Sequence, residues 1–272
     1  MIIWIASYPK SGNTWVRALI TSYLYSDMGE FNFNLLRQIP KFTQKKFISP
    51  IVNLEELEKD PLKISEYWKN SQSRINLDNQ TKFLKTHNAC ISYQGKWFTD
   101  ESNSIGYIYI VRDPRAVVCS LASHAKISME KAVDDLVNPN QVGYNGPHNL
   151  AEISSSWKIN YLSWKKEKKF KGIVIKYEDL IDNTEREFRK ILIYLKKIKK
   201  IKIEDERIKK TILSCHFSNL SKMENDNGFE ESTDAKFFRK GRKDSWKKDL
   251  NKNLIQKIEK NFKIEMTELG YL

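Results

Sequence analysis

The chain has 272 residues, enough for one large α/β domain with a substantial core, and its formal net charge is +13. This excess of Lys and Arg indicates an anionic partner, such as a nucleotide, an acidic acceptor or a nucleic acid. The chain contains no apolar run of transmembrane length, and residues 2–6 are too short and lack the basic residues of a signal peptide, so we expect a cytoplasmic protein without a membrane span.

Four apolar runs predict the strands of a parallel sheet, at residues 2–6, 82–86, 105–111 and 172–176. Helical patterns cover residues 16–25, 115–125, 129–136, 151–168, 183–197, 205–214 and 250–269. Strands that alternate with helices predict a single α/β domain over residues 1–272, with a central parallel sheet flanked by helices and ligands at the carboxyl ends of the strands. Residues 27–80 and 124–150 show no clean periodicity, so we expect irregular loops there that recognise an acceptor.

The stretch Y-P-K-S-G-N-T-W at residues 8–15 joins the first strand to the first helix. Backbone N–H groups and the helix dipole at such a turn favour an anion. Lys10 adds a positive charge, and Ser11 and Thr14 add hydroxyl donors. Lys10 precedes Gly12, whereas the Walker pattern places its Lys after the last Gly, so the loop is P-loop-like rather than a Walker loop. An ordinary strand-to-helix turn is the alternative.

A second motif, Y-I-V-R-D-P-R-A, begins at residue 109 and continues to Ser120. Arg112 ends the third strand and can direct two N–H donors at a phosphate. Pro114 suits the first turn of a helix, and Ser120 lies about two turns further along the same side. A surface turn held by ion pairs is the alternative.

Two further segments carry cations or a histidine. Lys85-Thr86-His87 lies at the end of the second strand, and F-F-R-K-G-R-K-D-S-W-K spans residues 237–247. A lone histidine is more often structural than catalytic, and we give His124, His148 and His216 that structural interpretation. The basic segment also fits a disordered loop.

Together these motifs resemble those of cytosolic-type sulfotransferases, including bacterial ones. The loop at residues 8–15 resembles the family loop that grips the phosphosulfate of 3′-phosphoadenosine 5′-phosphosulfate (PAPS), with Asn13 where Thr is common. The segment from Arg112 to Ser120 resembles the family motif for the 3′-phosphate. Residues 237–247 resemble the family's R-K-G-x-x-G-D-W-K, which implies that Arg239, Lys240 and Gly241 close over that phosphate. Asp244 and Ser245 depart from this pattern, because they stand where the family usually has Gly and Asp.

The resemblance also implies roles for individual residues. His87, in a K-T-H, would be the catalytic base, with an ordinary pKa suited to that role near neutrality. Lys10 would neutralise the bridging oxygen, and Lys85 would hold the sulfuryl oxygens. The residues implied at the cofactor are Lys10, Ser11, Gly12, Asn13, Thr14, Trp15, Arg112, Ser120, Tyr177, Phe217, Arg239, Lys240 and Gly241. Tyr177 begins a Y-E-D-L and would lie near adenine, with Phe217 and Trp15 stacking on its faces. Trp157 and Trp164 resemble core aromatics of a family helix.

The implied activity is transfer of a sulfuryl group from PAPS to a hydroxyl or amine of a small-molecule, carbohydrate or lipid acceptor, with 3′-phosphoadenosine 5′-phosphate (PAP) as product. We expect no metal, because the cations and the helix dipole replace it and no cluster of Asp, Glu and His in the sequence suggests a metal site. The three cysteines lack metal-ligand spacing and are typical of buried thiols in a reducing compartment. A degenerate P-loop kinase or NTPase and a non-catalytic nucleic-acid binder remain as alternatives, although we expect no nucleic-acid partner. Acceptor identity and oligomeric state stay open.

Overall fold

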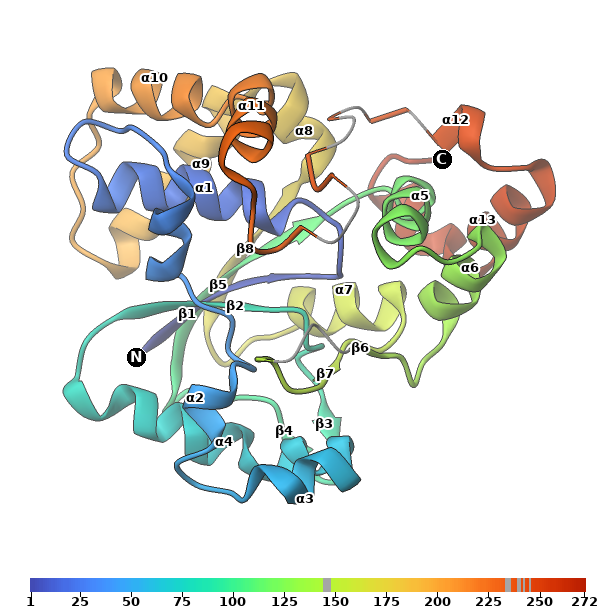
Figure 1. Ribbon diagram of the computed structural model, residues 1–272, viewed down its shortest axis with the longest axis horizontal. Coiled ribbons are helices and arrows are strands. Elements are labelled where there is room, and N and C mark those ends of the chain that lie inside the picture. The colour runs from blue at the N-terminus through green and yellow to red at the C-terminus, as the bar shows by residue number, and fades with distance from the viewer. Residues whose placement is uncertain (144–147, 233–235, 239–240, 242, 245) are drawn as a thin grey trace.

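The computed structural model describes residues 1–143, 148–232, 236–238, 241, 243–244 and 246–272 (Figure 1). The strands are β1 (Ile2–Ser7), β2 (Lys82–Thr86), β3 (Ser92–Tyr93), β4 (Lys96–Trp97), β5 (Ser104–Val111), β6 (Val142–Gly143), β7 (Glu152–Ile153) and β8 (Lys171–Lys176). The α-helices are α1 (Asn13–Tyr25), α2 (Lys45–Ile48), α3 (Leu54–Lys59), α4 (Ile64–Ile75), α5 (Pro114–Ala125), α6 (Met129–Val137), α7 (Trp157–Lys165), α8 (Tyr177–Asp182), α9 (Thr184–Ile198), α10 (Asp205–Ser214), α11 (Phe217–Asn227), α12 (Trp246–Asp249) and α13 (Lys252–Glu268). Three short 3₁₀ segments lie at Phe33–Gln38, Pro61–Lys63 and Asn76–Asp78.

The central sheet has the order β2-β1-β5-β8, and each neighbouring pair is parallel. This confirms the predicted α/β class and all four predicted strands. The two neighbours of β1, β2 and β5, both follow it in sequence, so the chain leaves β1 first toward one side of the sheet and then toward the other. Such a switch point opens a crevice at the carboxyl end of the strand, which here is the end of β1.

Side chains of β1 alternate between two cores, as the strand pleat requires. Ile3 and Ile5 belong to a cluster with residues of α1, α9 and α10, whereas Ile2, Trp4 and Ala6 belong to a second cluster with residues of α4, α5, α7 and α13. In Figure 1, α1, α9 and α10 lie together at upper left, α2–α4 at the bottom, and α5, α6 and α13 at right. Helices therefore cover both faces of the sheet and leave its carboxyl edge for the loops.

The expectation of irregular structure over residues 27–80 is wrong for α4. Ile64, Trp68 and Ile75 face the core at helical spacing, but Ser71 and Gln72 occupy buried positions between them. Their polar groups bond to backbone carbonyls, Ser71 Oγ to Phe47 O at 2.9 Å and Gln72 Nε2 to Phe98 O at 2.6 Å. These buried polar residues interrupt the apolar period that would have revealed the helix.

The prediction of a helix at residues 151–168 is wrong for residues 151–156, which precede the helix in the structure. Glu152 and Ile153 form β7, which pairs antiparallel with β6, and α7 begins only at Trp157. Ser156 is the N-cap, and its hydroxyl accepts a hydrogen bond from Ile159 N at 3.3 Å. Trp157 and Trp164 are both fully buried, which confirms their packing role.

Candidate functional site

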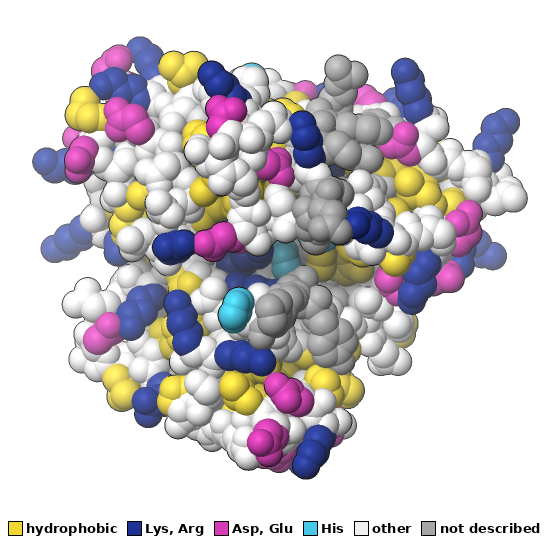
Figure 2. All heavy atoms as spheres, viewed as in Figure 1, with side chains coloured by type: hydrophobic (Ala, Val, Ile, Leu, Met, Phe, Trp, Pro, Cys, Tyr) yellow, Lys and Arg dark blue, Asp and Glu magenta, His cyan; other side chains and the backbone are white. Residues whose placement is uncertain are grey.

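A cavity of about 740 Å³ lies at the carboxyl edge of the sheet. Figure 2 shows a groove across this face, with Lys or Arg and His side chains inside it. Residues from every predicted motif line the cavity, namely Lys10, Gly12, Asn13, Thr14, Trp15, Lys85, His87, Arg112, Ser120, Tyr177, Phe217 and Gly241. Arg239 and Lys240 lie outside the described residues. The fold thus brings motifs from distant parts of the sequence around one space.

The loop between β1 and α1 has a special backbone. Lys10 has φ 64° and Gly12, the N-cap of α1, has φ 99°. A Cβ at Gly12 would lie 2.5 Å from Cδ2 of Tyr177, so the loop needs glycine for both its conformation and its contact. No side chain caps α1 among the described residues, so the N–H groups of Asn13 and Thr14 are not used by a cap and are available to an anion.

Several buried polar atoms at this loop have no hydrogen-bond partner among the described residues. They are Ser11 Oγ, Asn13 Oδ1, Arg17 Nε and Arg112 Nε. Unpaired buried polar atoms are costly, and a group that supplies acceptors for the hydroxyl and the guanidinium nitrogens would pair most of them. This donor set fits a phosphate-like ligand.

Asn13 has a different side-chain role from that of its neighbours. Its Nδ2 donates to Ile5 O at 2.9 Å and to Ser7 Oγ at 3.3 Å, so the amide ties the loop back to β1. The contribution that this position offers to an anion is its backbone N–H.

Lys10 extends its amine into the cavity, 4.0 Å from the centroid of the Phe237 ring. Burial lowers the pKa of Lys10 to about 7, and the nearby positive charges of Lys85 and Arg112 add to that effect, while Glu231 opposes it. The amine is thus poised to gain charge when an anion arrives.

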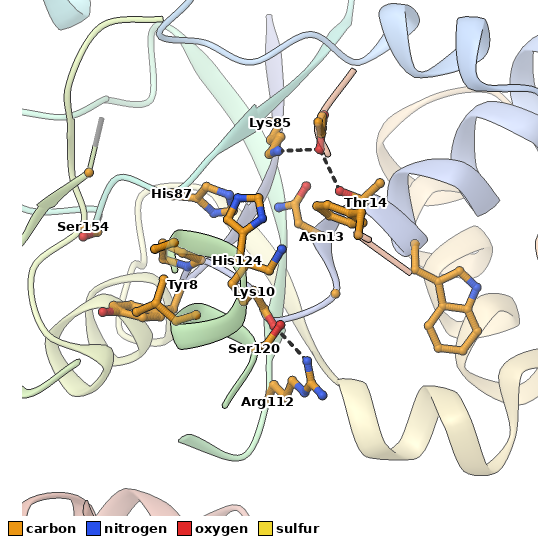
Figure 3. A pocket seen from close by; sticks show the side chains of 18 of the residues that line it. Tyr8, Lys10, Asn13, Thr14, Lys85, His87, Arg112, Ser120, His124 and Ser154 are labelled. Carbon is orange, nitrogen blue, oxygen red and sulfur yellow. Dashed lines mark hydrogen bonds and ion pairs between the residues drawn. The ribbon is translucent and has the colours of Figure 1, made fainter. Parts of the chain in front are cut away.

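Arg112 directly follows β5, Ser120 lies on the next helix, α5, and Tyr177 begins α8. Arg112 NH1 donates to Lys10 O at 3.0 Å, and its guanidinium lies 4.3 Å from the Tyr177 ring centroid. Figure 3 shows this bond, with Ser120 beside it. The arrangement holds the guanidinium next to the anion loop.

The aromatic residues of the site lie around Tyr177 and Phe217. Trp15 meets Tyr177 edge to face at 5.9 Å, and its Nε1 donates to Cys215 O at 3.0 Å. Gly241 packs so closely on Phe217 that a Cβ there would lie 2.7 Å from the ring. These rings form an apolar wall next to Arg112.

His87 is held from three sides. Its Nδ1 lies 2.8 Å from Ser7 O, its backbone N–H donates to Glu152 Oε1 at 2.8 Å, and its carbonyl accepts from Asn160 Nδ2 at 2.9 Å. Because a carbonyl oxygen only accepts, Nδ1 carries the proton and Nε2 keeps its lone pair.

The expectation of an ordinary His87 pKa is wrong. Burial lowers the pKa of His87 to about 4, with Glu152 opposing the shift and Lys85 and Lys41 adding to it. The imidazole is therefore neutral at pH 7, the form that a proton acceptor needs.

The sequence analysis missed four charged residues at this site. Lys41 pairs with Glu152 at 2.8 Å, and Glu231 pairs with Arg17 at 2.6 Å and with Lys85 at 3.1 Å. Of these four, only Arg17 could have been assigned to the site from the sequence, because it lies one helical turn after Thr14 on the predicted helix. The structural interpretation of His124 also misses a feature, since His124 lines the same cavity.

Two further findings concern metal-binding groups and cysteines. The described residues contain no group of three or more His, Cys, Asp or Glu side chains placed to hold a metal ion. Cys90, Cys119 and Cys215 are all buried, as expected, and none of these three forms a disulfide.

The comparisons with known proteins agree with this geometry. The family model described as a sulfotransferase domain matches residues 2–270. The chain belongs to the sulfotransferase domain family. Its relatives include flavonol 3-sulfotransferase of Flaveria bidentis, 26% identical over 95% of this chain and 79% of the relative. Cytosolic sulfotransferase 12 of Arabidopsis thaliana is 25% identical over 94% of this chain and 74% of the relative.

Solved structures share the fold of this sulfotransferase. Mouse sulfotransferase SULT7A1 complexed with PAP has a TM-score of 0.61 at 18% identity, covering 97% of this chain and 83% of that one. Retinol dehydratase in complex with androsterone and inactive cofactor PAP has a TM-score of 0.63 at 16% identity, covering 97% and 80%. Among the helices that the structure describes, none is both long and apolar enough to cross a bilayer.

Proposed function

We propose that this sulfotransferase moves a sulfuryl group from PAPS to a hydroxyl or amine of a small-molecule, carbohydrate or lipid acceptor and releases PAP. The observation that carries the proposal is the convergence of the Lys10 loop, Arg112 and the neutral His87 on one cavity. The family match and the PAP-bound structural neighbours support it. We also propose a single domain over residues 1–272 and a cytoplasmic location, for which the three buried thiols are support.

Different residues of the proposed cofactor site would contact the 5′ end, the 3′-phosphate and the adenine of PAPS. The backbone N–H groups of Gly12–Thr14 and the hydroxyls of Ser11 and Thr14 would hold the 5′ end. Arg112 and Ser120, with Arg239, Lys240 and the amide of Gly241, would hold the 3′-phosphate. Trp15, Tyr177 and Phe217 would contact adenine.

The residues of this chain would divide the chemistry as follows. PAPS supplies a sulfuryl group on a phosphate leaving group. His87 Nε2 accepts the acceptor's proton as the new bond to sulfur forms. Lys10 faces the oxygen that receives the electron pair of the broken sulfur–oxygen bond, and Lys85 holds the sulfuryl oxygens. Positioning and charge stabilisation are thus the main contributions of the protein.

Neither alternative gains support. A Mg²⁺-dependent kinase needs a carboxylate beside its anion loop for the metal, but Glu231 beside Thr14 is already paired with Arg17 and Lys85. A nucleic-acid binder needs basic and aromatic side chains on an open surface, whereas Lys10 and Arg112 line a recessed cavity at the carboxyl edge of the sheet.

The first expected result concerns nucleotide selectivity. PAP should raise the melting temperature more than AMP or ADP and bind at least roughly tenfold tighter than AMP, because each charge-assisted hydrogen bond to the 3′-phosphate contributes about 1.5–3 kcal/mol. Calorimetry should show that Arg112→Met lowers the ratio of PAP affinity to AMP affinity. Arg186→Met, which removes the same charge from a side chain that is 54% exposed, should keep the ratio. Equal affinity of the wild type for PAP and AMP would contradict the proposal.

The second expected result concerns protons. The pKa of Lys10 is about 7 without ligand, and an adjacent phosphate raises it because the anion favours the charged amine. PAP binding above pH 7 should therefore take up a proton, and PAP affinity should fall as the pH rises. Titration calorimetry in two buffers of different ionisation enthalpy measures this uptake. Lys10→Arg, which stays charged, should abolish it, and equal uptake by this variant would show that another group titrates.

A further inference from the structure

Glu231 places a carboxylate inside the anion site. Its Oε2 accepts from Thr14 Oγ1 at 2.9 Å and lies 3.1 Å from Lys85 Nζ, while Oε1 lies 2.6 Å from Arg17 NH1. Figure 3 shows the bonds from Lys85 and Thr14 meeting at one oxygen. This carboxylate comes from the segment after α11, far in sequence from the three residues that it contacts.

The surroundings keep Glu231 ionised. Burial alone would raise the pKa of Glu231, but Lys85 and Arg17 outweigh burial and hold that pKa well below its usual range. The side chain of Lys85 is only 10% exposed, and that of Arg17 is 4% exposed. Glu231 therefore acts as a built-in anion that neutralises two buried cations.

This inference rests on the proposed function, in which PAPS uses side chains that Glu231 contacts in this structure. Lys85 is assigned to the sulfuryl oxygens, which PAPS carries and PAP lacks, whereas Thr14 is assigned to the 5′ end, which both nucleotides carry. A second anion placed beside an ionised carboxylate is repelled, so both cannot hold Lys85 at contact distance. PAP carries no sulfuryl group, so its binding leaves the contact between Lys85 and Glu231 in place.

We propose that Glu231 is a selectivity-determining residue whose carboxylate competes with the transferring sulfuryl group for Lys85. Binding of PAPS moves this carboxylate off Lys85. Once the sulfuryl group has left on the acceptor, the carboxylate returns to Lys85, which favours departure of the sulfated product. Glu231 thus weakens the site for PAPS and leaves its affinity for PAP nearly unchanged.

The test is titration calorimetry of PAPS and PAP, without acceptor, on the wild type, Glu231→Gln and Glu230→Gln. Glu230 is the matched control, because this neighbouring carboxylate also lines the cavity but pairs with Arg37, with its side chain 78% exposed. Glu231→Gln should tighten PAPS about tenfold and change PAP by less than about twofold, which corresponds to about 1.4 kcal/mol of selectivity. Glu230→Gln should change neither the PAPS affinity nor the PAP affinity.

A double-mutant cycle shows whether the effect acts through Lys85. In a Lys85→Met background, Glu231→Gln should no longer change the ratio of PAPS affinity to PAP affinity. If Glu231→Gln alone unfolds, Glu231→Asp takes its place, because its shorter side chain draws the carboxylate away from Lys85 and should also raise the PAPS affinity relative to the PAP affinity. Equal tightening of both nucleotides, or no change in either, would overturn the role of Glu231 while leaving the proposed function intact. Failure of the wild type to bind either nucleotide would overturn the proposed function and this inference together.

Discussion

Replacing His87 with alanine is expected to lower kcat by about 10²–10⁴, the usual cost of losing a general base. The reason lies in the tautomer, since the proton on Nδ1 is directed at Ser7 O and leaves Nε2 as the basic atom. PAP affinity should hardly change, because the base meets the acceptor's proton rather than the nucleotide. Steady-state kinetics with calorimetry of PAP separate the two effects.

A second variant guards against a loss of structure at this buried position. His87→Asn offers an amide that can replace the bond to Ser7 O but has no basic nitrogen, so it should be as inactive as the alanine variant. His216→Asn is the matched control, because His216 is exposed and caps α11, a role that asparagine also fills. Substantial turnover by His87→Asn would show that another group accepts the proton.

Replacing Lys10 with methionine should lower kcat by about 10²–10³ at saturating PAPS and affect PAP binding much less. Charge accumulates on the bridging oxygen only as its bond to sulfur breaks, so the amine stabilises the transition state more than the bound donor. The N–H groups of α1 and the Ser11 hydroxyl remain to hold the phosphate. Single-turnover rates at saturating PAPS isolate the chemical step.

The control for this variant is Lys196→Met, which removes the same charge from an exposed position on α9. It should retain the rate of the wild type. If Lys10→Met instead raised the PAPS requirement and then turned over normally, Lys10 would serve binding alone and the leaving oxygen would need another partner.

The parts of the fold that depend on local pattern could be predicted. The first five residues of β1 are apolar and buried on both faces, which is the signature of a central parallel strand, and α10 has the bounds that its pattern predicts. The pattern fails where polar residues are buried, as at Ser71 and Gln72 in α4. It also fails before Trp157, where the N-cap Ser156 was the overlooked signal.

The candidate site divides in the same way. Loop residues such as Lys10 and Arg112 follow strand ends, so the parallel sheet predicts that they meet. Glu231 and Glu152 could not be predicted as site residues, because each reaches its partner only through tertiary packing. Glu231 lies in a segment without a predicted element, and Glu152 lies in a segment wrongly predicted as helix. The low pKa of His87 has the same origin, since it follows from burial that the sequence does not show.

The most direct test of the account is sulfuryl transfer itself, followed with sulfur-labelled PAPS and a panel of phenol, alcohol, saccharide, lipid and amine acceptors. Mass spectrometry of the acceptor and quantification of PAP give both products. The account predicts that an acceptor gains one sulfuryl group for each PAP formed, and that both products are lost in His87→Asn but not in His216→Asn. PAP that forms at the same rate without any acceptor, or equally in His87→Asn, would contradict it.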